Sequence, residues 1–250
     1  MPNSQFVGDE LLLLPDAFNA LRAHFKSREG FEAEYKHIAD PLEKIHFLRL
    51  ASVYKNLVKD GNFSVPLETL SKSDINFYDV TYKYIALISI IEAVFVKDDW
   101  LDFYRWLSRS SKKMKVFPIE DQNALDNLYE QYNSEYGVIR NTVKFFKALE
   151  IDEQNFLKTK LARFSVNDGK VSEIESTISD IAKLLYDIRS QFMHRAKLIV
   201  EFDDIPSITI NRKQIKPFTS TLTLSQLMRV FEIGFIRHFG MRPERKMPLF

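Results

Sequence analysis

The most regular pattern in the chain lies at residues 172–195, which read SEIESTISDIAKLLYDIRSQFMHR. At about 100° per residue, its large apolar side chains fall within about 80° of one another on a helical wheel. These side chains are Ile174, Ile178, Ile181, Leu185, Ile188 and Phe192. The spacing predicts one long helix over 172–195, capped by Ser172 and packed through this stripe against a core.

Helical patterns recur on both sides of this segment. We expect further helices at 16–26, 41–59, 73–95, 100–107, 120–132, 134–149, 152–164 and 223–240. Asp40 and Pro41 have the composition of an N-cap followed by a first helical residue. The 73–95 run is apolar around most of its circumference, which predicts a central position. Asn167-Asp168-Gly169-Lys170 is a turn signal that separates two of the expected helices.

The period changes after residue 195. Residues 198–202, 207–210 and 214–219 are rich in strand formers, and 211–213 have the composition of a turn. The predicted fold class is therefore all-α, a helical bundle with a small β-hairpin insertion near 198–219. We divide the chain into an N-terminal helical extension at 1–70, a bundle at 74–240 and a flexible tail at 241–250.

Composition excludes several classes of function. The chain has no cysteine, so disulfide frameworks, thiolate metal sites and cysteine nucleophiles are impossible. Hydrophobic residues are 45% and charged residues 28%, which is enough for a packed core. The net charge of +1 excludes an overall basic coat, yet residues 186–250 carry 11 Lys and Arg against 6 Asp and Glu. This local excess of positive charge favours a polyanionic partner, although a solvated charged surface explains it equally well.

No targeting or membrane-spanning segment is predicted. The most apolar run, 84–96, is too short to cross a bilayer and contains Glu92. We therefore expect a cytoplasmic protein with no membrane partner. The sequence also lacks the glycine-rich phosphate loops and the Gly-x-Ser-x-Gly elbow of nucleotide-binding proteins and hydrolases.

Two Glu-x-x-His spacings, Glu34 to His37 and Glu43 to His46, invite a metal-site interpretation. They are only nine residues apart with Pro41 between them, whereas di-iron bundles carry such motifs on separate long helices. We interpret them as surface polar residues and expect neither a metal nor a cofactor.

The chemistry-bearing residues of the chain are Arg189 and His194. With Arg189 at 0° on the wheel, Tyr186 lies at about 60°, Ser190 at about 100°, Lys183 at about 120° and His194 at about 140°, whereas the core stripe occupies about 260–340°. Arginine offers a bidentate fork to phosphate oxygens, and histidine transfers protons near neutral pH. The spacing alone favours the other interpretation, in which Arg189 is paired to an acid and His194 caps helix carbonyls.

The segment 185–194, LYDIRSQFMH, resembles the signature helix of HEPN-domain proteins, in which Arg-x(4–6)-His ends a long helix of a helical bundle. The 84–95 helix with Glu92, the YGVIRN run at 136–141, which is similar to the ApeA-like branch, and the closing helix at 222–239 agree with this resemblance. It covers about residues 74–240. Three positions depart from the family pattern. Family members often have Asn, Asp or His where this chain has Ser190, and Gly where it has Arg195. One toxin subgroup has Tyr where this chain has Ala196.

The resemblance implies a HEPN-like fold and a metal-independent endoribonuclease. Arg189 would hold the scissile phosphate, and His194 would act as general base or acid while the ribose 2′-OH attacks. Tyr186, Lys183, Ser190 and Arg195 would support substrate binding. The implied partners are RNA and a second copy of the chain, packed through the 172–195 helix, in a toxin or phage-defence effector. Because some HEPN proteins are not catalytic, the alternative is a dimeric interaction or nucleotide-binding module.

Overall fold

The structure is a computed structural model of the 250-residue chain, and it describes residues 4–62, 71–95, 101–110, 119, 121–167, 170–195, 207–209, 218–245 and 248. These residues form ten α-helices, two short helical turns and four short strands. The helices are α1 (Ser4–Leu21), α2 (Arg28–Lys36), α3 (Pro41–Tyr54), α4 (Lys72–Ala93), α5 (Phe103–Ser110), α6 (Gln122–Tyr136), α7 (Val138–Lys147), α8 (Ile151–Lys160), α9 (Ile178–Arg195) and α10 (Leu224–His238). The turns are η1 (Arg22–His24) and η2 (Lys55–Lys59), and the strands are β1 (Leu161–Asn167), β2 (Lys170–Ile174), β3 (Ser207–Thr209) and β4 (Phe218–Ser220).

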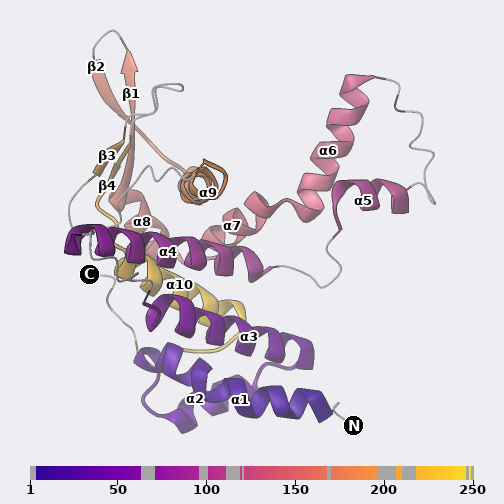
Figure 1. The fold of residues 1–250 in the computed structure, drawn as a ribbon, viewed down its shortest axis with the longest axis vertical. Helices are drawn as coiled ribbons and strands as arrows, with labels where there is room; N and C mark the ends of the chain where they lie inside the picture. Colours follow the sequence, from indigo (N-terminus) through magenta and orange to yellow (C-terminus); the bar gives the residue numbers. More distant parts are fainter. Residues whose placement is uncertain are drawn as a thin grey trace.

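Helices α4 and α10 occupy the middle of the molecule (Figure 1). Helices α1, α2 and α3 lie on one side of them, and α7, α8 and α9 lie on the other. The central position predicted for α4 is confirmed, since Tyr84, Leu87, Ile88 and Ile91 have no exposed surface. None of the described helices combines the length and the apolarity needed to cross a lipid bilayer.

The N-terminal helices share one hydrophobic core with the rest of the chain. This core runs from Ala17 in α1 to Met241 after α10. Phe47 of α3 stacks on Phe235 of α10 with ring centroids 5.2 Å apart, and Tyr54 lies 4.8 Å from Phe231 one turn earlier. Helix α3 of the expected 1–70 extension thus packs directly on the closing helix.

A buried polar cluster around Glu232 reinforces this contact. The Glu232 carboxylate, whose side chain is 8% exposed, accepts from Tyr54 at 2.7 Å and Lys59 at 3.0 Å, and it pairs with His24 Nε2 at 2.8 Å. Burial alone would raise the pKa of Glu232, but the bonds from His24 and Tyr54 and the charge of Lys59 together lower it. Glu232 is therefore a charged residue that fixes η1, α3 and η2 on α10.

The strands form one antiparallel sheet in the order β2-β1-β4-β3. Strands β3 and β4 lie within the hairpin predicted near 198–219, and residues 198–206 and 210–217 lie outside the described residues. Strands β1 and β2 were not predicted. Asn167 pairs with Lys170, so the two residues between them are Asp and Gly, the composition that two-residue hairpin loops prefer.

This hairpin corrects the start of the 172–195 helix. Ser172 lies opposite Ser165 in the sheet, and α9 begins at Ile178. The cap is Thr177, whose side-chain oxygen accepts from the backbone N–H of Asp180 while the Asp180 carboxylate accepts from the backbone N–H of Thr177. Ile174 is consequently on a strand and 37% exposed, not on the core stripe.

The segment after α10 is held in place as far as Arg245, although we expected a flexible tail. Met241 is buried, and the backbone N–H of Arg242 donates to Glu34 at 2.8 Å. The Glu244 N–H donates to the His24 carbonyl at 2.9 Å, and the Glu244 carboxylate accepts from the Lys26 N–H at 2.6 Å. These bonds satisfy polar groups at the end of η1 and so order the chain there.

Candidate functional site

Helix α9 carries the candidate residues and is anchored through its apolar stripe. Ile178, Ile181, Leu185 and Ile188 are buried as predicted, and Ala182 is buried with them. The Tyr84 hydroxyl of α4 donates to the Leu185 carbonyl at 2.5 Å, which ties the two helices together at their crossing. The position of α9 is therefore set by α4 on one side and by α7 and α8 on the other.

Arg189 is held by α4. Its Nη2 atom lies 3.4 Å from Glu92 Oε2 and donates to Ser89 Oγ at 3.4 Å. The wheel places Arg189 on a face that the core does not need, but in the fold this edge of α9 contacts α4, and the Arg189 side chain is only 20% exposed. The contact agrees with the interpretation in which Arg189 pairs with an acid.

The ion pair is incompletely satisfied. Arg189 Nε and Glu92 Oε1 are both buried and have no hydrogen-bond partner within the described part of the chain. Burial raises the pKa of Glu92, and the Arg189 charge lowers it only in part. Two long contacts of 3.4 Å and two unpartnered atoms make this a weak pair.

Glu92 was not among the residues predicted for the site. Its sequence signal is that it is the one charged residue in the apolar run 84–96. An ionisable side chain in such a helix needs a partner, because burying an isolated charge is costly. The identity of the partner was not available from the sequence, since Arg189 lies 97 positions away.

His194 has a different environment from Arg189. It lies exposed in the last turn of α9 beside Met193, which is 54% exposed, and Arg195, which is also exposed. Within the described residues, the His194 imidazole forms neither a hydrogen bond nor an ion pair. It therefore does not cap a helix carbonyl there, as the spacing also allowed. The imidazole is thus available to solvent and to a ligand.

The supporting residues divide between the two environments. Lys183 and Ser190 share the side of α9 that His194 occupies, where Lys183 is exposed and Ser190 is half-buried. Tyr186 belongs with the ion pair: burial, and then the Glu92 charge, raises the pKa of its hydroxyl, whereas the Arg189 charge opposes this effect. The site is a surface strip of α9 whose inner edge is the Arg189–Glu92 pair.

An exposed apolar edge adjoins the strip. Tyr82 of α4, 42% exposed, packs against Phe192 of α9 with ring centroids 6.1 Å apart. Met193 follows Phe192, and Tyr78 stands one turn before Tyr82 and is 43% exposed. Large apolar side chains that remain exposed around polar residues are typical of a binding surface.

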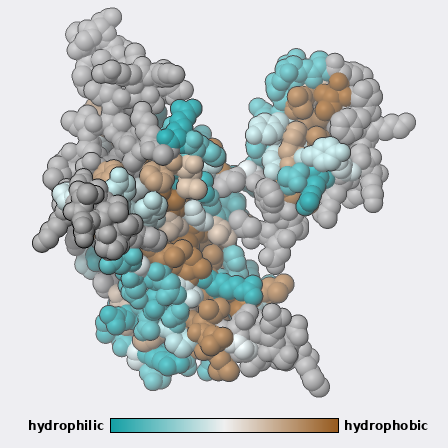
Figure 2. All heavy atoms as spheres, in the orientation of Figure 1, coloured by the Kyte–Doolittle hydropathy of each residue, from teal (hydrophilic) through white to brown (hydrophobic). Residues whose placement is uncertain are grey.

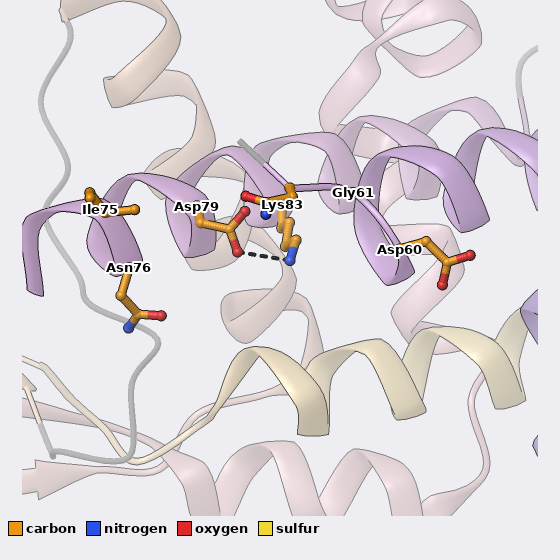
Figure 3. A pocket seen from close by; sticks show the side chains of 7 residues that line it. Asp60, Gly61, Ile75, Asn76, Asp79 and Lys83 are labelled. Carbon is orange, nitrogen blue, oxygen red and sulfur yellow. Dashed lines mark ion pairs between the residues drawn. The ribbon is translucent and has the colours of Figure 1, made fainter. Parts of the chain in front are cut away.

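A separate polar cleft of about 470 Å³ lies between η2 and α4 (Figure 3). It is lined by Asp60, Gly61, Asn62, Ile75, Asn76, Asp79 and Lys83. Lys83 is paired with Asp79 at 2.7 Å, and Asp60 is paired with Lys55 at 3.3 Å. Two carboxylates facing one lysine give this cleft a negative balance, so it does not suit a phosphate.

The two Glu-x-x-His spacings lie in different surroundings. Glu34 lies 3.8 Å from His37 and accepts from the Arg242 N–H, and His46 hydrogen-bonds the Ala93 carbonyl at 3.1 Å. Among the residues that the structure describes, no group of three or more His, Cys, Asp and Glu side chains could hold a metal ion.

Comparison with known proteins finds no relative of this chain. The chain matches no protein-family model, and no curated protein or solved structure is significantly similar to it. The functional interpretation consequently depends on the residues of α4 and α9 themselves.

Proposed function

We propose that the protein is a metal-independent endoribonuclease of HEPN type, acting in the cytoplasm as a toxin or phage-defence effector. The observation that carries the proposal is the incompletely paired Arg189 at the inner edge of a strip whose exposed end is His194. A guanidinium with an unused buried N–H and a solvent-exposed imidazole on one helix supply the two functions that RNA cleavage needs without a metal.

In the proposed reaction the Arg189 guanidinium breaks its ion pair with Glu92 and binds the scissile phosphate. The ribose 2′-oxygen attacks phosphorus, and His194 takes the proton of the 2′-hydroxyl. The bond from phosphorus to the 5′-oxygen breaks, and that oxygen receives a proton from an acid. The products are a 2′,3′-cyclic phosphate and a 5′-hydroxyl end, and DNA is not cleaved because it lacks the attacking hydroxyl.

A second copy of the chain would provide the acid. One His194 can be the base and the other the acid if two α9 helices meet about a two-fold axis. The exposed apolar edge at Tyr82 and Met193, beside the strip, supports such a contact. Lys183 and Arg195, both exposed, would contact the flanking phosphates of the RNA.

Cleavage of end-labelled RNA in EDTA tests the proposal. We expect wild-type protein to produce cyclic-phosphate ends and His194→Ala to lower the rate at least 100-fold with an unchanged circular dichroism spectrum. His37→Ala, which removes another exposed histidine, is the matched control and should cleave normally. Absence of cleavage across diverse RNAs, or equal cleavage by wild type and His194→Ala, would overturn the nuclease.

The second candidate is a non-catalytic interaction or nucleotide-binding module that acts as a dimeric scaffold. It is favoured by the engagement of Arg189 with Glu92 and Ser89, a contact that stabilises the α4–α9 crossing whether or not RNA is cleaved. In this case RNA or a nucleotide binds without turnover, and binding survives His194→Ala.

A further inference from the structure

Helices α5 and α6 form a small unit outside the main core, here called the arm. Four aromatic side chains hold the two helices together, with ring centroids 5.3 Å apart for Phe103 and Tyr132 and 5.9 Å apart for Trp106 and Tyr132. Tyr129 completes the group at 5.3 Å from Phe103. Among the described residues, the main core contains no member of α5 or α6. Figure 1 shows the arm standing away from the body, to which α7 connects it.

The arm leaves apolar surface uncovered. Tyr104 is 75% exposed and Tyr129 is 51% exposed. None of the described side chains of α6 is fully buried, and its Leu125 and Leu128 are only half-buried. Figure 2 shows hydrophobic side chains at the surface of this unit. A 15-residue helix obtains most of its stability from packing, so this degree of exposure indicates a missing partner.

The charges of α6 and of the next helix are complementary. Helix α6 contains Asp126 and Glu130, exposed one turn apart, and it contains no Lys, Arg or His. Helix α7 contains Arg140, Lys144 and Lys147, all exposed and all within about 60° on the helical wheel, and it contains no acidic residue. Glu130, Arg140 and Lys147 make no ion pair within the described part of the chain.

The two helices do not cover each other. They meet at Gly137, whose backbone leaves the helical conformation with ψ at 125°, and a Cβ there would collide with the Asn133 carbonyl. Helix α6 continues away from α7 beyond this bend (Figure 1). Asp126 accepts a hydrogen bond from Gln122 and Lys144 lies over the Phe95 ring. Glu130 of α6 and Arg140 and Lys147 of α7 are therefore the charges left to meet another molecule.

We propose that the arm docks on a second copy of this chain, with α6 of one protomer on the basic side of α7 of the other. Because α6 and α7 are consecutive and diverge at Gly137, a two-fold axis near this bend forms both contacts at once, and each arm clamps the opposite protomer. Helix α7 packs against α9, so the clamp braces the helix next to the one that carries the partner's candidate site. The inference rests on the homodimer of the proposed function and adds the surface that holds it; it does not depend on RNA cleavage.

Sedimentation velocity over a range of protein concentrations tests the clamp. We expect wild type to be dimeric, and Asp126→Lys/Glu130→Lys and Arg140→Glu/Lys147→Glu each to raise the dimer Kd at least tenfold, because like charges then face each other. Mixing the two variants should restore a one-to-one heterodimer through opposite charges. Glu173→Lys/Glu175→Lys, which changes the net charge by the same amount as the α6 variant at exposed residues in and directly after β2, should remain dimeric.

Three results would overturn the clamp: a monomeric wild type at all concentrations, charge-reversed variants that dimerise normally, or a mixture that does not reassociate. These results are distinguishable from failure of the nuclease. A dimer that depends on the arm but cleaves no RNA removes the nuclease and keeps the clamp. RNA cleavage by a dimer that is insensitive to the arm variants removes the clamp and keeps the nuclease.

Discussion

Replacing Glu92 by Gln separates the two roles that the structure assigns to Arg189. The substitution keeps the shape of the side chain and one carbonyl oxygen, and it removes the charge that competes with phosphate. Breaking a buried ion pair costs about 3–5 kcal/mol when the pair is well made. Here both contacts are 3.4 Å long, Arg189 is 20% exposed and burial already raises the pKa of Glu92. We therefore expect a loss of only about 1 kcal/mol, or about 2–4 °C in Tm for a chain of this size.

The same change should strengthen RNA binding. Freed from the carboxylate, Arg189 can engage phosphate without first breaking an ion pair worth about 1 kcal/mol, which corresponds to a gain of about threefold to tenfold in Kd. Fluorescence anisotropy with an RNA carrying 2′-O-methyl groups measures binding without cleavage. Arg189→Lys retains the charge but lacks the fork, so in its background Glu92→Gln should have a smaller effect on binding.

The matched control is Glu153→Gln, which removes a carboxylate of equal 8% exposure from an ion pair with Arg237 at 2.9 Å. It should lower stability more than Glu92→Gln, since its contact is shorter, and leave RNA affinity unchanged. If Glu92→Gln weakens RNA binding or has no effect on it, Glu92 does not compete for Arg189, and the guanidinium acts only at the α4–α9 crossing.

Two further predictions concern stability and pH. Glu232→Gln should lower the free energy of unfolding in urea by about 2–4 kcal/mol, because Lys59 and Tyr54 lose a charged acceptor. Since the pKa of Glu232 is lowered in the fold, its contribution to stability is present above about pH 4.5 and is lost as the pH drops through the folded pKa. This pH-dependent contribution should be missing in Glu232→Gln, whereas Glu175→Gln, at an exposed residue, should change nothing. Burial, with the charges of Lys144 and His46, lowers the pKa of His238 to about 4. The fold should therefore lose about 1 kcal/mol of stability as the pH falls from about 6.5 to 4, because the unfolded chain takes up the proton first; the value is reduced from the full linkage value because the ring is partly exposed. His238→Asn should abolish this loss, and His37→Asn, at an exposed residue, should retain it.

Local patterns were sufficient for most of the helices. The capping pair Asp40 and Pro41 begins α3 as expected, with the Asp40 carboxylate accepting from the Leu42 N–H at 3.0 Å, and the apolar stripe from Ile178 to Ile188 is the buried side of α9. The hairpin at β1 and β2 was missed although its turn signal was recognised, because the residues on both sides of the turn were assigned to helices. The position of β1 inside the sheet has no local signal, since it depends on pairing with β4, where Ala162 lies opposite Thr219. A strand whose partner is more than fifty residues away has no short-range signal for that pairing.

The candidate site divides in the same way. Arg189 and His194 were identified from residue type and helical spacing, because both properties are local to α9 and follow from 3.6 residues per turn. The crossing of α9 with α4 places Arg189 against Glu92 and Ser89 and leaves His194 in solvent. The sequence could not show this, because burial and charge pairing depend on which helices are in contact. The sequence alone determined which side chains α9 carries; the packing of α4 against it determined which of them is already engaged and which is free.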